Sequence, residues 1–252
     1  MCAVTEPKVP QRAPDFIGIG TQRSGTTWWF ESLLEHPDVV LPRSGKKELH
    51  FFQRFCMREL KQGDIWHYRT RFQTEPGQVT GEWTPRYMHD FWTPPLLKRA
   101  APDAKLLVML RDPVERMRSG LPHRLSMGRM PMMDRLTYDA IQRGRYGTQV
   151  RRLLHWYDRE QIIFLQYEQC VRDPIEHYSR TLRFLGVKDD FVPEDMRKPR
   201  GVSRESAKEP MWADFEAGVK ATLEPEVELL AELLPEFEID LWPNFRDLVA
   251  KV

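Results

Sequence analysis

Cysteines and long apolar runs are both scarce in this chain of 252 residues. The three cysteines, at positions 2, 56 and 170, are too few and too widely spaced for a disulfide framework or a metal-binding cluster. The longest apolar stretch, Leu106–Leu110, has the length of a strand, whereas a membrane helix needs roughly 20 apolar residues. Residues 1–14 are polar, rich in proline and without an apolar signal core. We therefore expect a reduced, cytoplasmic globular protein with no membrane span and with a flexible N-terminal arm at 1–14.

The chain also lacks an excess of either charge. It has 38 Lys and Arg residues and 37 Asp and Glu residues, which gives a net charge of +1. With 41% hydrophobic residues, this balance excludes a disordered chain and a basic nucleic-acid-binding domain. The distribution is uneven, since residues 111–152 contain ten Arg and four acidic residues, and residues 205–240 contain eleven acidic residues and two Lys. A positive site for an anion is therefore compatible with the near-zero total, although solvated helix faces produce the same pattern.

Short apolar segments alternate with helical patterns along the chain. Buried strands are predicted at 16–20, 39–41, 79–82, 105–110 and 162–165. Helices are predicted at 26–36, from Asp112-Pro113 onward, at 145–157, at 173–186 and at 227–234. This alternation favours an α/β fold with a central parallel sheet flanked by helices, in a single domain that covers residues 15–252. Ligands of such sheets bind beyond the carboxyl ends of the strands, so functional residues are expected there.

The segment Gly20–Thr27 joins the first predicted strand to the first predicted helix. Its glycines allow backbone N–H groups to turn inward on an anion, and the helix that follows adds its positive end. The spacing is similar to that of the nucleoside-triphosphate P-loop, but Thr26 stands where that loop has its lysine. ATP hydrolysis and phosphoryl transfer are therefore disfavoured, and Arg23 supplies positive charge within the loop instead. The alternative is a glycine-containing turn without a special function.

A second candidate anion site follows the predicted strand at 105–110. Arg111 lies at the tip of this strand, Asp112 is placed to cap the next helix, and Ser119 lies two turns along it. A guanidinium fork and a hydroxyl group together suit a phosphate. Two phosphate-sized sites on neighbouring strand tips indicate a nucleotide that is phosphorylated at two positions. A capped helix with basic surface residues is the alternative.

These segments resemble a known family, the sulfotransferases that use 3′-phosphoadenosine 5′-phosphosulfate (PAPS). Gly20–Thr27 resembles the family's 5′-phosphosulfate loop, and Arg111–Ser119 is similar to its 3′-phosphate motif. Residues 47–52 and 81–87 resemble two segments of the heparan sulfate N- and 3-O-sulfotransferase branch. Arg200-Gly201 is similar to the basic loop that closes over the nucleotide. Because the motifs occur in family order, the resemblance implies a P-loop NTPase-like sulfotransferase fold in a soluble bacterial relative of that branch.

The resemblance also implies a reaction, in which PAPS is the co-substrate, 3′-phosphoadenosine 5′-phosphate (PAP) is the product and no metal is required. A sulfuryl group moves by in-line displacement to a hydroxyl or amine of a small-molecule or saccharide acceptor. Glu48 matches the general base, His50 an assisting residue, and Arg23 the residue that stabilises the bridging oxygen. The nucleotide is expected to contact residues of the two loops and of the late basic segment: Gln22, Arg23, Ser24, Gly25, Thr26, Thr27, Trp28, Arg111, Ser119, Arg200 and Gly201.

The acceptor side departs from the family pattern. The heparan branch has a lysine where this chain has Trp83, so the role of that lysine is vacant or passes to Lys47 or Arg86. Substrate contacts are expected from Lys47, Trp83, Arg86, Tyr87 and His123. Aromatic and methionine residues of two loops favour an apolar acceptor pocket over a highly charged glycan: Trp66, Tyr68, Phe72, Met127, Met130, Met132 and Met133.

Two other functions are compatible with the same scaffold. A P-loop kinase for a small metabolite would need the lysine that Thr26 replaces. A non-catalytic nucleotide- or anion-binding module would need no base, and without the family match Glu48 is better explained as a surface carboxylate in a Lys-Lys-Glu run. The sequence predicts no nucleic-acid partner and does not define an oligomeric state.

Overall fold

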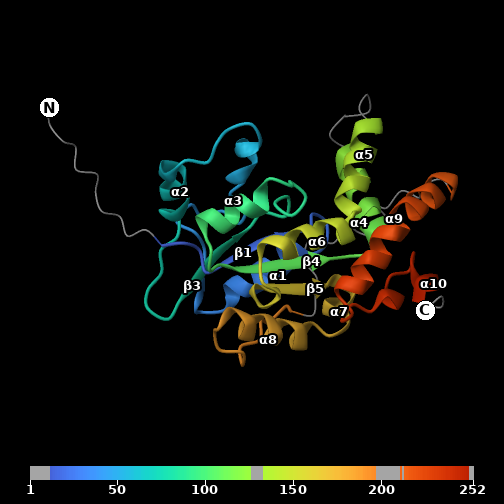
Figure 1. Ribbon diagram of the computed structural model, residues 1–252. Coiled ribbons are helices and arrows are strands. Elements are labelled where there is room, and N and C mark those ends of the chain that lie inside the picture. Colours follow the sequence, from blue (N-terminus) through green and yellow to red (C-terminus); the bar gives the residue numbers. More distant parts are fainter. Residues whose placement is uncertain (1–11, 126–132, 197–210, 212, 250–252) are drawn as a thin grey trace.

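Five parallel strands form the centre of the computed structural model, which describes residues 12–125, 133–196, 211 and 213–249 (Figure 1). The strands coincide with the predicted apolar segments: β1 (Phe16–Gly20), β2 (Val39–Val40), β3 (Val79–Trp83), β4 (Lys105–Leu110) and β5 (Ile162–Gln166). They are largely buried, as expected for a parallel sheet that is covered on both faces. The predicted α/β fold with a single central parallel sheet is confirmed.

The strand order is β2-β3-β1-β4-β5, which places β1 in the middle of the sheet. Phe16 of β1 is in register with Gly81 of β3 and with Lys105 of β4. A Cβ atom at Gly18 would lie 2.0 Å from the ring of Trp83, so only glycine fits at this position. The strands β2 and β3, which follow β1 in the chain, lie on one side of it within the sheet, and the later strands β4 and β5 lie on the other side. The segment after β1 therefore lies at the switch point of the topology, where ligands of such sheets bind.

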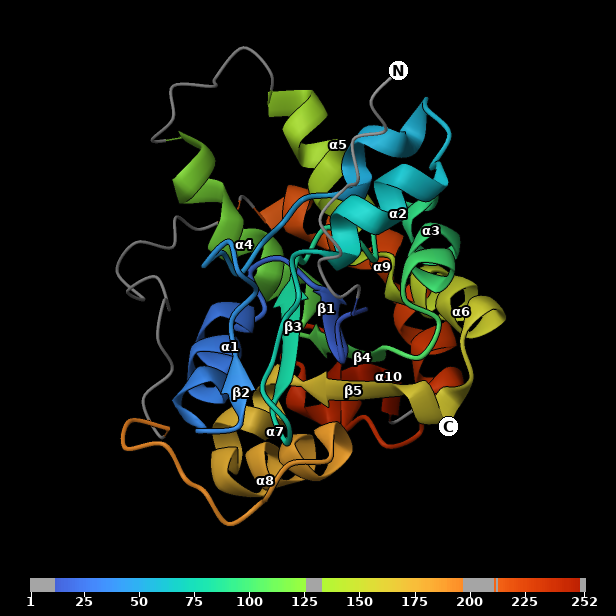
Figure 2. The same ribbon diagram turned by 90° about the vertical axis from the view of Figure 1, so that its left-hand side faces the viewer.

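Helices cover both faces of the sheet (Figures 1 and 2). The aromatic side chains of one face come mainly from α1 (Thr26–Glu35) and α8 (Pro174–Leu185). The opposite face packs against α3 (Thr93–Ala100), α6 (Tyr146–Trp156) and α9 (Ala213–Leu233). The other helices are α2 (Gln62–Arg69), α4 (Pro113–Leu125), α5 (Met133–Gly144), α7 (Tyr167–Arg172) and α10 (Arg246–Val249). Since both faces are covered, the ends of the strands are the places where a ligand can approach the sheet.

Two helices begin where local signals predict. Asp112 accepts hydrogen bonds from two amides in the first turn of α4, at 2.9 and 3.1 Å. Asp173 accepts one from the amide of Glu176 at 3.3 Å, and α8 ends at Gly186, whose φ is 85°. In both cases an aspartate followed by proline fixes the helix start, because the carboxylate satisfies amides that have no partner within the helix.

The helix α9 differs most from its prediction. A helix was expected at 227–234, whereas α9 begins at Ala213 and contains Pro225 in its interior. Proline removes a helical hydrogen bond, but Val219 and Leu223 on the preceding turns are buried against the core, and their burial offsets this cost. Neither α9 nor any other helix of the described residues is long and apolar enough to cross a membrane.

Candidate active site

A hollow of about 310 Å³ lies beyond the carboxyl ends of β1, β3, β4 and β5. Residues that follow these strands line it together with the predicted base: Gln22, Arg23, Gly25, Thr26, Thr27, Glu48, Pro85, Arg111, Ser119 and Tyr167. Most of the predicted nucleotide-binding positions are therefore brought to one place. Within the described residues, no group of three His, Cys, Asp or Glu side chains is arranged to hold a metal ion.

The loop between β1 and α1 forms one wall of the hollow. Thr21 anchors it, because its amide donates to a carbonyl of β4 at 2.8 Å and its Oγ1 lies 2.7 Å from Ser24 Oγ. Arg23 and Gly25 both have left-handed backbone conformations, with φ of 71° and 87°. A Cβ atom at Gly25 would lie 2.8 Å from the ring of Tyr167. The loop thus turns sharply and presents the start of α1, with its partial positive charge, to the hollow.

Arg111 and α4 form the opposite wall. The Arg111 side chain is 11% exposed, and its guanidinium carbon lies 4.8 Å from the centre of the Tyr167 ring. Its Nη1 donates to the carbonyl of Arg23 at 3.4 Å, and Arg23 Nε donates to the carbonyl of Ser119 at 3.0 Å. Two guanidinium groups and a helix start therefore surround the same hollow, which is an arrangement suited to an anion.

Lys47 brings an ammonium group to the start of α1. Its Nζ lies 3.2 Å from Thr26 Oγ1, 3.1 Å from Thr27 Oγ1 and 3.3 Å from Glu48 Oε1. Burial lowers the pKa of Lys47, and the nearby carboxylate of Glu48 partly offsets this effect. The positive charge that a P-loop carries in its own lysine is here supplied by a separate segment of the chain.

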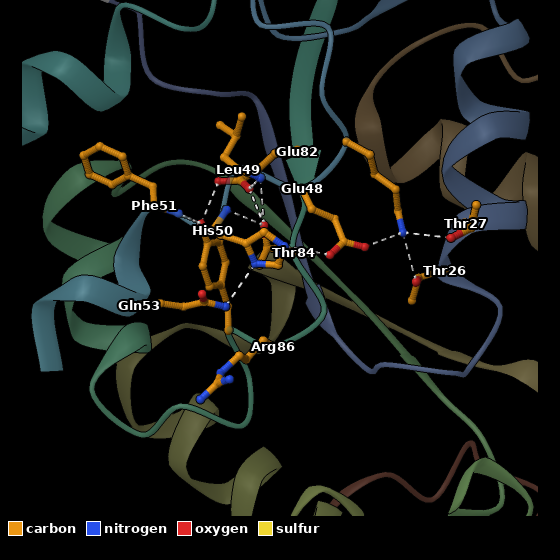
Figure 3. A network of polar contacts seen from close by, with 12 residues as sticks. Thr26, Thr27, Glu48, Leu49, His50, Phe51, Gln53, Glu82, Thr84 and Arg86 are labelled. Atoms are coloured by element: carbon orange, nitrogen blue, oxygen red, sulfur yellow. Dashed lines mark hydrogen bonds and ion pairs between the residues drawn. The ribbon is translucent and has the colours of Figure 1, made fainter. Parts of the chain in front are cut away.

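Glu48 connects Lys47 to His50 at the mouth of the hollow (Figure 3). The Glu48 side chain is 37% exposed, and its Oε2 lies 3.2 Å from His50 Nε2. The other ring nitrogen of His50 lies 3.0 Å from Gln53 Nε2. A carboxylate that is solvent-accessible, lies beside an anion site and contacts a histidine is placed to accept a proton from a bound ligand.

The sequence model of the sulfotransferase domain matches residues 13–208, which is well over half of the chain. The chain belongs to the sulfotransferase family. It is 31% identical over 191 residues to human heparan sulfate glucosamine 3-O-sulfotransferase 3B1, a match that covers 71% of this chain and 47% of the relative. The chain thus spans about half the length of the curated relatives that it matches.

Solved structures of sulfotransferases share the fold. The enzyme from Alicyclobacillus acidocaldarius superimposes with a TM-score of 0.72 at 26% identity, covering 91% of this chain and 98% of that one. The sulfotransferase domain of the Synechococcus olefin synthase superimposes with a TM-score of 0.55 at 18% identity, covering 94% and 99%. Sulfotransferases of this family generally use PAPS as the sulfuryl donor.

Two predicted substrate contacts, Trp83 and Tyr87, lie in the core of the chain. Trp83 is fully buried, and its Nε1 donates to the carbonyl of Gly20 at 3.0 Å beneath the loop. Tyr87 is also fully buried, and its hydroxyl accepts a hydrogen bond from the amide of Phe51 at 2.8 Å. Both aromatic residues hold the site from within the core, so neither ring can contact an acceptor.

Two described residues of the predicted apolar acceptor pocket lie in the core instead. Tyr68 and Phe72 are fully buried and pack against each other, with ring centres 5.1 Å apart, in a cluster that includes Phe51 and Phe52. Trp66, on α2, is only partly buried. Tyr68 and Phe72 therefore pack in the core, and the preference for a hydrophobic acceptor stays a prediction.

Other predicted positions lie away from the hollow or outside the described part of the chain. Ser24 and Trp28 are buried, Ser24 against Thr21 and Trp28 on the buried face of α1. Arg86 pairs with Asp90 at 2.9 Å, and Figure 3 shows its guanidinium pointing away from Glu48. For the remaining predicted residues, the structure describes either no side chain or no position at all: His123, Met127, Met130, Met132, Met133, Arg200 and Gly201.

Three residues of the site have no role assigned from the sequence. Tyr167 and Pro85 line the hollow, and Glu82 lies fully buried beneath the segment that carries Glu48. Burial raises the pKa of Glu82 to about 7, although four hydrogen bonds oppose the shift. All three lie at or just after the carboxyl end of β3 or β5, where functional residues are expected, but no motif singles them out.

A second hollow, of about 530 Å³, is lined mainly by residues 86–92 and by residues of α5 and α6. Its rim includes Phe91 and Tyr138, which are 66% and 67% exposed. Trp92 and several basic side chains also line it, namely Arg86, His89, Arg145 and Arg152, as do Asp90 and Asp139. Burial and nearby arginines lower the pKa of His89 to about 4, so this histidine is neutral at pH 7.

Proposed function

We propose that the protein is an enzyme that moves a sulfuryl group from PAPS to a hydroxyl or amine group of a saccharide or another small acceptor. One observation carries the proposal: Lys47 Nζ lies within 3.3 Å of Thr26, Thr27 and Glu48. An anion-binding helix start, an ammonium group and a carboxylate thus meet at a single hollow. Membership of the sulfotransferase family supports the same reaction.

The two walls of the hollow bind the two ends of the nucleotide. Thr26 and Thr27 at the start of α1 hold the 5′-phosphosulfate through hydroxyl and amide groups. Arg111 and Ser119 hold the 3′-phosphate, with the guanidinium kept in position by the Tyr167 ring. Arg200-Gly201 remains a prediction for the same phosphate.

Glu48 acts as the general base in an in-line displacement. PAPS supplies an activated sulfuryl group, whose S–O bond to the 5′-phosphate breaks as the acceptor oxygen forms a new S–O bond. Glu48 takes the proton of the acceptor hydroxyl, and His50 orients the carboxylate from 3.2 Å. Lys47, Arg23 and the start of α1 stabilise the negative charge that develops on the leaving phosphate. The products are PAP and the sulfated acceptor.

Lys47→Met is expected to lower the rate of transfer by about 100-fold, the cost typical of losing one preorganised donor to a developing negative charge. The substitution keeps the length of the side chain but removes the ammonium group beside Thr26, Thr27 and Glu48. Rates of PAP release from PAPS measure the effect. Lys46→Met is the matched control, because Lys46 is the exposed neighbour and contacts none of these groups. Equal losses in both variants would exclude a specific role for Lys47.

The second hollow receives the acceptor. Exposed aromatic rings stack on the apolar faces of sugar rings, and the arginines between them pair with acidic or hydroxyl groups. These features fit a saccharide acceptor better than an apolar one. The human relative is named for sulfation of a glucosamine of heparan sulfate, which is a saccharide.

Phe91→Ala and Tyr138→Ala are each expected to raise the KM for the acceptor about tenfold, because each loses one stacking surface worth about 1–2 kcal/mol. The KM for PAPS and the unfolding temperature stay unchanged, since both rings are largely exposed. Trp156→Ala provides the control, as this exposed aromatic residue lies at the end of α6 and does not line the hollow. An unchanged acceptor KM in both variants would place the acceptor elsewhere.

The proposed function is tested with a panel of saccharides and phenols and with ³⁵S-labelled PAPS. Transfer of label to one class, and micromolar or tighter binding of PAP, support the reaction. A parallel titration with ATP and Mg²⁺ examines the kinase alternative, which the lysine-free loop disfavours. Binding of PAP without transfer to any acceptor would favour the non-catalytic module.

A further inference from the structure

The segment 47–51, which carries Glu48 and His50, has neither helical nor strand structure. Its backbone hydrogen bonds are therefore made with other parts of the chain, and they go to the end of β3 and the residues after it. The amide of Trp83 donates to the carbonyl of Lys47 at 2.8 Å. The backbone of the predicted base is thus attached to the strand next to β1.

Three successive amides of this segment donate to side chains (Figure 3). The Leu49 amide lies 3.1 Å from Glu82 Oε2 and 3.1 Å from Thr84 Oγ1. The His50 amide lies 3.3 Å from Thr84 Oγ1, and the Phe51 amide donates to the Tyr87 hydroxyl at 2.8 Å. The side chains of Glu82, Thr84 and Tyr87 thus supply the hydrogen-bond acceptors that a neighbouring strand would offer in a sheet.

The Glu82 carboxyl group holds this arrangement together from within the core. Besides the Leu49 amide, it accepts hydrogen bonds from Thr84 Oγ1 at 2.6 Å, from the Tyr68 hydroxyl at 2.8 Å and from the Tyr87 hydroxyl at 3.3 Å. Four donors match the capacity of an ionised carboxylate. Burying such a group is costly, so its presence under a loop calls for an explanation beyond packing.

The conformation of His50 supplies a second, independent observation. Its φ of 49° lies in the left-handed region, which residues other than glycine seldom adopt unless the surroundings impose it. Thr84 holds the His50 amide, and the same conformation brings His50 Nε2 within 3.2 Å of Glu48 Oε2. The contact between histidine and base therefore depends on a backbone conformation that the segment would not keep alone.

We infer that Glu82, Thr84 and Tyr87 are positioning residues, which fix segment 47–51 so that the Glu48 carboxylate faces the hollow. The importance of Glu48 rests on the proposed function, whereas the fixing of the segment does not. The three side chains touch the backbone of the segment and do not line the hollow. They act on the reaction through the segment that carries Lys47 and Glu48, and not by lining the hollow.

Hydrogen exchange and turnover together test the inference in the full chain. Thr84→Val and Tyr87→Phe each remove an acceptor for amides of the segment, so exchange at 49–51 is expected to accelerate at least tenfold. In both variants kcat is expected to fall about tenfold or more, and the affinity for PAP is expected to change less than kcat. Thr84→Ser retains the hydroxyl and is expected to restore slow exchange and turnover.

Tyr68→Phe is the matched control, because it also removes a hydroxyl that binds Glu82 but makes no hydrogen bond to the segment. Equal acceleration of exchange in Tyr68→Phe would reveal general loosening and overturn the inference, as would fast exchange with unchanged kcat in Thr84→Val and Tyr87→Phe. If the unsubstituted protein transfers no sulfuryl group, the proposed function fails. The exchange comparison alone then decides whether Glu82, Thr84 and Tyr87 fix the segment.

Discussion

Glu48→Gln is expected to lower kcat by 100- to 1,000-fold, within the range that a general base contributes to proton transfer. The amide keeps the size of the side chain and its contacts with Lys47 and His50, but it cannot accept the proton of the acceptor. The affinity for PAP is expected to stay within about twofold of that of the unsubstituted protein, since other residues of the hollow form the two nucleotide-binding walls. Steady-state transfer from labelled PAPS and calorimetric titration with PAP measure the two quantities.

Glu59→Gln is the matched control for this substitution. Glu59 is exposed and does not line the hollow, so full turnover is expected. If Glu48→Gln transfers sulfuryl groups at the normal rate, Glu48 has no part in the reaction, and another base must be sought. Loss of transfer with loss of PAP binding would instead indicate damage to the nucleotide site.

Arg111→Ala is expected to weaken PAP binding by about 10- to 100-fold, because a charge-assisted hydrogen bond contributes roughly 1.5–3 kcal/mol. The residue is the better buried of the two arginines that line the hollow, and its guanidinium stacks on Tyr167. Arg111→Lys is expected to recover only part of the affinity, since an ammonium group lacks the planar fork that suits phosphate. Titration with PAP at fixed ionic strength measures both variants.

A comparison of nucleotides shows whether Arg111 binds the 3′-phosphate. If it does, Arg111→Ala weakens PAP far more than adenosine 5′-phosphate, which lacks that group. Arg151→Ala, on the exposed side of α6, controls for the loss of one positive charge. Equal weakening of both nucleotides would assign Arg111 to the 5′ end of the ligand.

The two substitutions also separate the proposed enzyme from its alternatives. A non-catalytic module would bind PAP through Arg111 but would be indifferent to Glu48→Gln. A kinase would bind ATP with Mg²⁺, for which the loop 20–27 lacks its lysine. The proposed sulfotransferase alone requires both residues for transfer and only Arg111 for binding.

Much of the fold was predictable because its signals are local. Apolar segments of strand length located all five strands to within two residues, and Asp-Pro pairs located the starts of α4 and α8. The helix α9 was underestimated, because Pro225 suggests a helix start and the burial of Val219 and Leu223 is a tertiary effect. The helix α2 escaped prediction since its two buried residues, Ile65 and Tyr68, give it only a weak amphipathic pattern.

The site was predictable in part. Loop residues such as Arg23 and Thr26 follow a spacing that encodes an anion site, and they line the hollow. Trp83 and Tyr87 were mistaken for substrate contacts, because an aromatic residue near a strand end has the same appearance in sequence whether it faces inward or outward. Their burial depends on Gly18 and on segment 47–51, which are distant along the chain.

The sequence by itself determined the strands, the parallel α/β architecture and the two anion-binding segments, since apolar runs, helix caps and glycine spacing act over a few residues. The tertiary structure decided which side chains meet. The order of the strands sets β3 beside β1, so Lys47 reaches Thr26 and Glu82 lies beneath Leu49. Contacts of this kind join residues more than twenty positions apart, and they depend on strand order and burial, which no local pattern specifies.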